Sequence, residues 1–405
     1  MGRGFLFVPA ARMVMKPSRS AFLSWIYDPK IRGIIAQVVT LIVLGLLVGW
    51  LAHNAIVNLA ARGIASGFDF LNDPAGFGIL QTLIPYTESD TYARVFVIGL
   101  LNTLLVSALG IVAATILGFI MGVARLSKNA LVSALATVYI ETFRNIPPLL
   151  QIFFWYFAVL QAMPSPRQSL GWFDAVFLNI RGLYLPRPIP TEAVTAFVVA
   201  VVLAFVLWWV IARWAKRRRD ETGQPFPVFW TGLGLVVLLP YLASLIFGSP
   251  FTWEVPRLRG FNFVGGWVMI PELVALWVAL SIYTSAFIAE IVRAGILAVP
   301  HGQTEAAMAL GLTSQQRLRL VILPQAMRVI IPPLTSQYLN LTKNSSLAAA
   351  IGYPDIVGLF AGTVLNQTGQ AIETIAMAMA VYLTISIMIS LFMNWYNKRM
   401  ALVER

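Results

Sequence analysis

The chain has 405 residues, of which 59% are hydrophobic and 11% are charged, and its formal net charge at pH 7 is +12. Such long apolar runs are typical of a multi-spanning membrane protein and exclude a large soluble domain. The absence of cysteine excludes disulfides, thiolate metal sites and cysteine nucleophiles, and two separate histidines do not form a metal cluster pattern. Excess lysine and arginine in a membrane protein mark cytosolic loops, so no nucleic-acid partner is expected.

Eight apolar segments are long enough to cross a bilayer, which requires about 20 residues. We expect spans at residues 33–55, 95–123, 131–160, 193–212, 228–247, 269–292, 333–362 and 371–396. With the N-terminus in the cytosol, the cytosolic segments hold 20 basic residues, the opposite face holds 7, and two fall inside spans. This imbalance is the positive-inside pattern and predicts that both termini are cytosolic. The short apolar run at 4–10 contains a proline and precedes basic residues, so we interpret it as part of a cytosolic arm.

Two loops of this chain have distinct compositions. The outer loop 163–192 is rich in proline and is predicted to be irregular but ordered in places. The basic run Arg213–Gly223 is predicted to be a cytosolic turn between two spans that anchors the topology and contacts anionic lipid.

A polar segment with the sequence HGQTEAAMALGLTSQQRLRLVILPQ separates the sixth and seventh spans on the cytosolic side. Pro300 stops the preceding helix, Thr304 starts a short one, and Gly311 ends it, after which the next helix begins near Thr313. The alanines of this short helix have small side chains, so the helix can fit into a groove on another protein. We therefore expect this helix to bind a cytosolic partner.

The same segment resembles the EAA-type loop of bacterial ABC importer permeases, whose short helix docks on the ATP-hydrolysing subunit. The matching positions are Glu305, Ala306, Ala307, Gly311, Val321, Leu323 and Pro324. The family pattern prefers isoleucine where this chain has Val321. The resemblance therefore implies that these seven residues couple the chain to an ATPase.

Longer blocks resemble the polar amino-acid permeases, also called the His-Glu-Gln-Arg-opine permease family. These blocks are Gly99–Ser127, Tyr139–Phe157, Tyr283–Ala307 and Leu323–Gly352. The start Trp25–Gly33, the extra first span and a two-span insertion resemble the Q-type permease subunit of general L-amino-acid importers. This resemblance covers most of the chain.

The resemblance implies an all-α polytopic membrane protein of the bacterial inner membrane, with a type I importer core of five helices. One helix is added before this core and two are inserted into it. The implied parts, in chain order, are a cytosolic arm 1–32, an additional span 33–60, a first core part 91–162, an insertion 163–267, and a second core part 268–398 with the coupling loop 300–325. The implied partners are a second related permease subunit, two cytosolic ATPase subunits that bind ATP and Mg, and a periplasmic amino-acid-binding protein.

Ionisable residues inside spans are costly and are candidates for the substrate pathway. Glu141, Arg144 and Asn145 share one helix face near the prolines at 147 and 148. Glu141 and Arg144 form either an internal salt bridge or a pair of pathway groups, since an amino acid has one carboxylate and one ammonium. Both alternatives are open at the level of sequence.

Lys343, Asn344 and Ser345 belong to a polar interruption of the seventh span. Transporters place such broken helices where they line a cavity, whereas helix packing through small polar residues is the alternative. Outside the pathway, Glu290 and Arg293 are predicted to form an interfacial pair that orients the coupling loop.

The chain lacks the G-x-x-x-x-G-K-[ST] motif, so it is not expected to hydrolyse ATP or to hold a cofactor itself. No nucleophile or metal-ligand set is evident. We therefore expect a transport subunit that alternates between inward-open and outward-open states when a separate ATPase moves the coupling loop. The competing hypothesis is a secondary amino-acid carrier driven by an ion gradient, which the lack of an evident inverted repeat or acidic proton relay disfavours.

Overall fold

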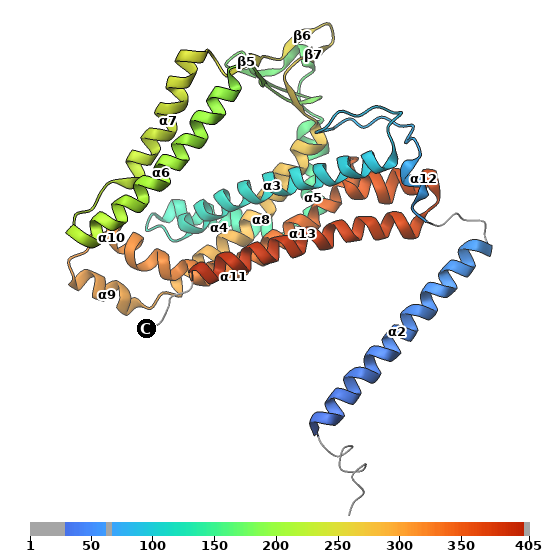
Figure 1. Cartoon of the computed structure of the whole chain (residues 1–405), viewed down its shortest axis with the longest axis horizontal. Helices are drawn as coiled ribbons and strands as arrows, with labels where there is room; N and C mark the ends of the chain where they lie inside the picture. Colours follow the sequence, from blue (N-terminus) through green and yellow to red (C-terminus); the bar gives the residue numbers. More distant parts are fainter. Residues whose placement is uncertain (1–28, 62–66, 401–405) are drawn as a thin grey trace, which may run out of the picture. The chain divides into compact units, whose positions relative to one another are not determined.

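The structure is a computed structural model that describes residues 29–61 and 67–400 (Figure 1). The chain divides into two compact units, Met1–Gly67 and Phe68–Arg405. The described part of the first unit is the helix α2, Pro29–Ala61, which contains a candidate membrane span. Most of the arm predicted at 1–32 lies outside the described residues.

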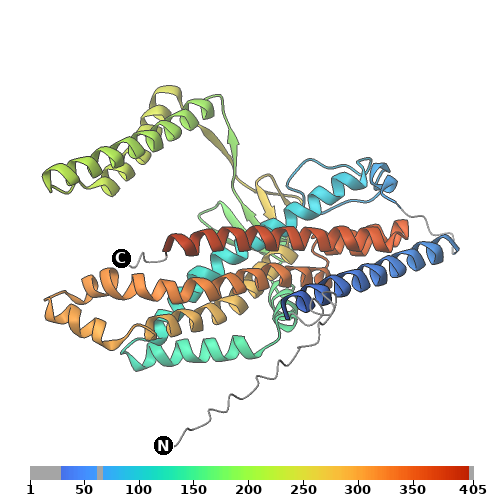
Figure 2. The same cartoon turned by 60° about the horizontal axis from the view of Figure 1, so that its bottom comes forward.

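A bundle of long helices forms the core of the second unit (Figures 1 and 2). Its members are α3 (Tyr92–Arg125), α4 (Ala130–Asn145), α8 (Pro271–Leu297), α11 (Leu323–Asn344) and α13 (Ala371–Met400). The helix α8 is central, because it packs against α3, α4 and α11. Its side chains Leu276, Leu280 and Ile288 are fully buried in the main apolar cluster. The packing around α8 therefore fixes the positions of the neighbouring core helices.

Glycines allow α3 to approach α8 closely. A Cβ atom added at Gly118 would lie 2.5 Å from Cγ2 of Ile288, and one added at Gly122 would lie 2.6 Å from the carbonyl oxygen of Ala289. Membrane helices associate without a hydrophobic driving force, so close backbone contact through small residues supplies the packing energy. The close contact between α3 and α8 therefore requires glycine at these two positions.

The helical membrane class is confirmed, since seven helices in the described ranges are long and apolar enough to span a bilayer. The third predicted span, 131–160, is not a single helix but is divided at the prolines 147 and 148. The helix α4 ends at Asn145, and after Pro147 the chain forms α5, Pro148–Phe153, and a π-helical segment, Phe154–Leu160. Proline lacks a backbone N–H and disfavours helix at the residue before it, so the pair at 147 and 148 interrupts the span.

The predicted boundaries of the seventh span, 333–362, are also wrong. Helical structure runs from α10, Ser314–Arg317, through a π-helical segment and α11 to a 3-10 segment that ends at Ile351. The polar stretch does not separate two spans, but the α-helix ends within it, at Asn344, and continues as the 3-10 segment Ser345–Ile351. The helix tightens at Ser345, whose hydroxyl donates to the carbonyl of Thr342 at 2.7 Å and so satisfies a backbone acceptor. A π-helical segment, Val357–Val364, and the short helix α12, Leu365–Thr368, then lead to α13.

Two helices of the 163–267 region, α6 (Val194–Thr222) and α7 (Val228–Phe247), form a hairpin. A Cβ atom at Gly232 of α7 would lie 2.2 Å from the indole of Trp208, so the two helices touch closely there. We call this pair the α6–α7 hairpin.

The segments that flank this hairpin form short antiparallel strands, which we call the outer β-module. Its strands are β1 (Leu170–Trp172), β2 (Val176–Asn179), β3 (Gly182–Leu185), β4 (Arg187–Pro190), β5 (Phe251–Glu254), β6 (Arg257–Arg259), β7 (Asn262–Val264) and β8 (Trp267–Met269). The strands pair in the orders β1-β2-β3-β8, β4-β5 and β6-β7. The segment 163–192, predicted to be irregular but ordered in places, is more regular than expected, because β3 and β4 pair with β8 and β5, about 60 to 85 residues later in the chain.

Candidate coupling and transport sites

The predicted coupling helix is present as α9, His301–Ala309. It begins directly after Pro300, three residues before the predicted start. Its end is a Schellman motif, in which the N–H groups of Gly311 and Leu312 donate to the carbonyls of Met308 and Ala307 at 2.9 and 3.1 Å. Gly311 has a φ of +73°, which explains glycine at this position. The next helix starts at a capping box between Thr313 and Gln316, as predicted.

The seven signature residues lie on different sides of this segment. Ala307 is buried against the rest of the chain, whereas Glu305 and Ala306 are exposed. Nδ1 of His301 lies 3.0 Å from Oε1 of Glu305, one turn away on the same helix. Val321 is half-buried, and Leu323 and Pro324 are exposed. The structure thus presents Glu305 on a surface that a second protein can reach.

Sequence reasoning missed the exposed apolar side chains in the loop that contains Glu305. Leu310 is 79% exposed, and Met308, Leu318 and Leu320 of the same loop are also exposed. Large exposed apolar side chains on a segment predicted to face the cytosol favour an interaction surface. The available signal was the presence of large apolar residues in a loop assigned to the cytosol.

The structure contradicts the internal salt bridge between Glu141 and Arg144. Oε1 of Glu141 pairs with Arg125 at 3.2 Å instead. The guanidinium of Arg144 lies 5.4 Å from the centroid of the Phe287 ring, and the side-chain amide of Asn145 donates to the backbone carbonyl of Glu141 at 2.7 Å. The pairing differs because the loop after α3 brings Arg125 next to α4, which the spacing within one helix cannot reveal.

Arg125 belongs to a charge network that joins three helices close to α9. Besides Glu141 of α4, it contacts Glu290 of α8 at 2.7 Å, and Glu290 also accepts from Nε of Arg293 at 3.1 Å. The predicted pair of Glu290 and Arg293 is therefore confirmed, and Arg125 is an additional member. The four side chains are between 20% and 49% exposed, so water screens their attraction only in part. The network ties α3 and α4 to the end of α8 that continues into α9.

A polar cavity of about 240 Å³ lies between α8 and α11. Its walls are formed by Tyr283, Thr284, Phe287, Gln337, Asn340 and Asn344. Among the predicted pathway residues only Asn344 lines this cavity, although Arg144 contacts the wall residue Phe287. Asn340 and Asn344 both belong to the predicted polar interruption, whereas Lys343 is exposed on the surface and Ser345 is buried and donates to the backbone of Thr342. Amide and hydroxyl groups in this arrangement can bind both a carboxylate and an ammonium group.

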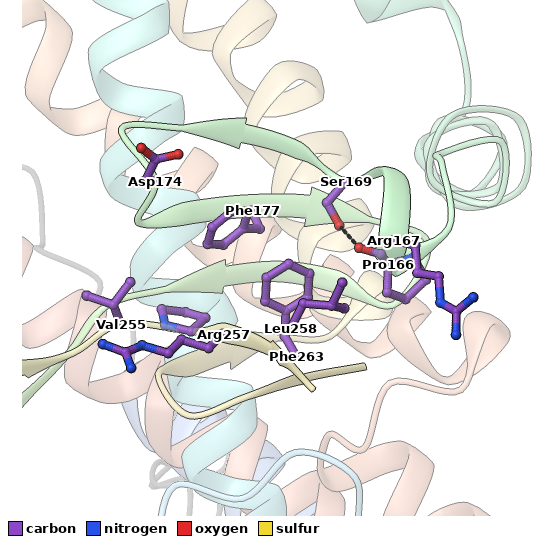
Figure 3. Close-up of a pocket in the computed structure, with 10 residues that line it drawn as sticks. Pro166, Arg167, Ser169, Asp174, Phe177, Val255, Arg257, Leu258 and Phe263 are labelled. Carbon is purple, nitrogen blue, oxygen red and sulfur yellow. Dashed lines mark hydrogen bonds between the residues drawn. The ribbon is translucent and has the colours of Figure 1, made fainter. Parts of the chain in front are cut away.

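A second cleft, of about 580 Å³, opens on the outer β-module (Figure 3). Phe177 and Phe263 form its floor, with ring centroids 4.6 Å apart. Figure 3 places the exposed side chains of Arg167 and Arg257 at opposite ends of the cleft. Asp174 also lines the cleft, so its surface offers apolar rings together with charges of both signs. Metal chemistry finds no support in residues 29–61 and 67–400, where no group of three or more potential metal ligands occurs.

Residues 114–402 match the family described as "Binding-protein-dependent transport system inner membrane component". The match covers more than half of the chain, and the chain belongs to this family. It is a multi-pass permease component of an inner-membrane transport system.

Individual relatives agree with this assignment. The chain is 61% identical over 378 residues to YhdX of Escherichia coli (strain K12), whose name describes an amino-acid ABC transporter permease, with 93% of this chain and 96% of that protein covered. It is 54% identical over 385 residues to the general L-amino acid transport system permease protein AapQ of Rhizobium johnstonii, with 95% and 96% covered. A solved structure of an amino acid ABC transporter with histidines matches at a TM-score of 0.46 and 21% identity, covering 76% of this chain and 95% of that one.

Proposed function

We propose that this chain is one permease half of an ATP-driven, type I importer of L-amino acids. The observation that supports this best is the geometry of α9. A short helix with a capped C-terminus exposes Glu305 in a loop that also exposes leucines, and it follows α8, the helix that the charge network ties to α3 and α4. The names of the relatives YhdX and AapQ refer to amino-acid permeases, which supports the substrate class.

The energy for transport comes from partners in this proposal. Two cytosolic ATPase subunits bind ATP and Mg, a second related permease subunit completes the pathway, and a periplasmic amino-acid-binding protein delivers the substrate. This chain has no phosphate-binding loop motif of its own and needs no cofactor. The outer cleft between Arg167 and Arg257 is a candidate contact for the binding protein.

Movement of α9 reaches the substrate cavity through α8. Closure of the ATPase subunits displaces α9, and α8 follows because only three residues, 298–300, separate the two helices. Arg125 transmits the displacement to α3 and α4 through Glu290 and Glu141. The cavity between α8 and α11 then opens alternately to the two sides of the membrane.

Hydrogen-bonding groups in the cavity define where an amino acid is bound. Asn340, Asn344 and Gln337 offer donors for the carboxylate and acceptors for the ammonium group. Arg144 adds a positive charge next to the wall residue Phe287. Glu141, Asn145 and Lys343 are exposed and lie outside the cavity wall, so they have no part in this binding step.

Purification of the chain from its native membrane tests this proposal. We expect an ATPase and a second permease to co-purify, and we expect the reconstituted complex to hydrolyse ATP faster when an L-amino acid and its binding protein are added. A solitary chain that takes up amino acids in an ion gradient without ATP would contradict the proposal and favour the secondary carrier.

A further inference from the structure

One face of α6 has an apolar hollow that the transport function does not use. The hollow has a volume of about 370 Å³ and is lined by Val202, Phe205, Val206 and Trp209. Their spacing of three, four and seven residues places them on one side of the helix. All four side chains are about half exposed or more.

Two basic residues continue this face toward the C-terminal end of α6. Arg213 lies four residues after Trp209, and its guanidinium is 3.9 Å from the centroid of the indole ring. Lys216 follows three residues later. Both are exposed, and neither makes an ion pair within the part of the chain that the structure describes. We call Val202, Phe205, Val206, Trp209, Arg213 and Lys216 the α6 stripe.

The α6 stripe is not needed for packing within the hairpin. The buried side chains Ala204 and Ala215 lie on the opposite face of α6, where Trp208 meets Gly232 of α7. The principal packing partner of α6 is α7, and Figure 1 shows the two helices side by side. The stripe is therefore available to the surroundings of the hairpin.

The length of α6 places the charged end of the stripe at the membrane surface. From Val194 to Ala212 the helix rises about 29 Å at 1.5 Å per residue, close to the roughly 30 Å thickness of the hydrocarbon layer. Trp209 then lies at the level where aromatic rings favour the interface, and Arg213 and Lys216 lie among the headgroups. Along α6, the apolar side chains therefore lie at the depth of a lipid acyl chain, Trp209 at the depth of the glycerol backbone, and the two basic residues at the depth of the phosphate.

We propose that the α6 stripe binds an anionic phospholipid, with an acyl chain in the apolar hollow and its phosphate on Arg213 and Lys216. A basic residue near the membrane surface favours an anionic headgroup, and the stacked indole holds the Arg213 guanidinium in place. The hollow adds an apolar contact next to the basic pair, so one lipid position is favoured in addition to a diffuse attraction. The inference does not depend on which substrate the protein transports.

Native mass spectrometry of the full-length chain, purified with whatever subunits accompany it, tests the site. Phosphatidylglycerol and phosphatidylcholine with the same acyl chains are added in turn, and glycerol phosphate serves as a headgroup without chains. We expect the wild type to retain phosphatidylglycerol preferentially and to retain no glycerol phosphate. In the double variant Arg213→Ala/Lys216→Ala, affinity for phosphatidylglycerol is expected to fall about thirtyfold, since two charges are lost.

The double variant Arg218→Ala/Lys128→Ala is the matched control, because Arg218 lies on the opposite side of α6, nine residues after Trp209, and Lys128 lies in the loop between α3 and α4. It is expected to reduce the affinity less than threefold. A third variant, Val206→Trp, fills the hollow and is expected to weaken retention of both phospholipids while leaving every charge in place. Recovery of each variant from the membrane fraction, with the same co-purifying subunits as the wild type, verifies that it has folded.

Three results would overturn the inference: equal losses in the two double variants, no preference for phosphatidylglycerol in the wild type, or unchanged retention in Val206→Trp. Equal losses would mean that only net charge attracts lipid. A protein subunit seated on the stripe would also overturn it, and cross-linking from residue 206 would identify that subunit.

Discussion

The helices α8 and α6 have similar lengths, 27 and 29 residues, and both qualify as candidate spans, yet their surroundings differ. About half of the α8 residues are buried in the bundle, whereas only Ala204 and Ala215 of α6 are buried, although the membrane-spanning stretch of α6 is more apolar than that of α8. Polar side chains of α8 such as Ser285, which lies 2.6 Å from the hydroxyl of Tyr139, require protein partners. In a bilayer, the helices with polar and small residues are thus the ones that become buried in protein, because apolar side chains are as stable in contact with lipid as with protein.

The largest effect is expected where backbones touch. In Gly122→Leu, the new side chain would meet the Ala289 carbonyl and Val292, which are parts of α8 that cannot move aside. We expect the free energy of unfolding to fall by about 3 kcal/mol. The midpoint of thermal denaturation in detergent measures this loss.

Gly234→Leu in α7 is the control for that substitution, because no atom lies within 4 Å of a Cβ added there. It is expected to leave the denaturation midpoint nearly unchanged. Equal losses in the two variants would contradict the distinction between a packed core helix and a lipid-facing hairpin.

Next in size is the charge network. Glu290→Gln leaves Arg125 without its closer partner and Arg293 without its own, and we expect a loss of about 2 kcal/mol, less than for a fully buried pair because water reaches these groups. Glu141→Gln removes a partner that is 49% exposed and is expected to cost less than about 1 kcal/mol. A larger loss in Glu141→Gln would show that α4, and not α8, is the centre of the network. Chemical denaturation of the two variants measures both losses.

For the cavity between α8 and α11, the predicted effect of a substitution is on transport activity and not on stability. Asn344→Leu removes a polar wall group, and we expect amino-acid uptake to fall about tenfold, which corresponds to about 1.4 kcal/mol, while the ATPase remains associated. Lys343→Leu alters the neighbouring exposed residue and is expected to reduce uptake less. Uptake by vesicles that contain each variant gives the comparison, and the opposite order would move the pathway away from the cavity.

The smallest effect is expected at the start of α9. His301 and Glu305 are 82% and 65% exposed, so their pairing contributes little, and His301→Ala is expected to change stability by about 0.5 kcal/mol or less. Near-normal uptake in this variant would show that Glu305 does not depend on His301. A complete loss of uptake would assign His301 a direct role in contact with the ATPase.

Local signals in the sequence predicted the features that depend on neighbouring residues. Pro300, Gly311 and Thr313 set the limits of the α9 segment to within three residues, because stops and caps are short-range interactions. The pair of Glu290 and Arg293 was predictable for the same reason, since its members are three positions apart on one helix.

Features that depend on contacts between distant segments were not predictable from the sequence. Arg125 pairs with Glu290, 165 residues away, and β4 pairs with β5 across the whole hairpin. Asn344 faces the cavity while its neighbour Lys343 does not, and only the packing of α11 against α8 decides between them. The break at the prolines 147 and 148 had a local signal, but apolarity on both sides suggested one span.

The central claim is that the core is coupled to an ATPase through α9, whereas the hairpin is not. Uptake of L-amino acids by the reconstituted complex tests it most directly when Glu305→Arg is compared with Glu221→Arg, the same charge reversal at the end of α6. We predict that Glu305→Arg inserts into the membrane normally but loses the ATPase and abolishes uptake, while Glu221→Arg keeps both. Normal uptake in Glu305→Arg, or equal loss in the two variants, would contradict the account.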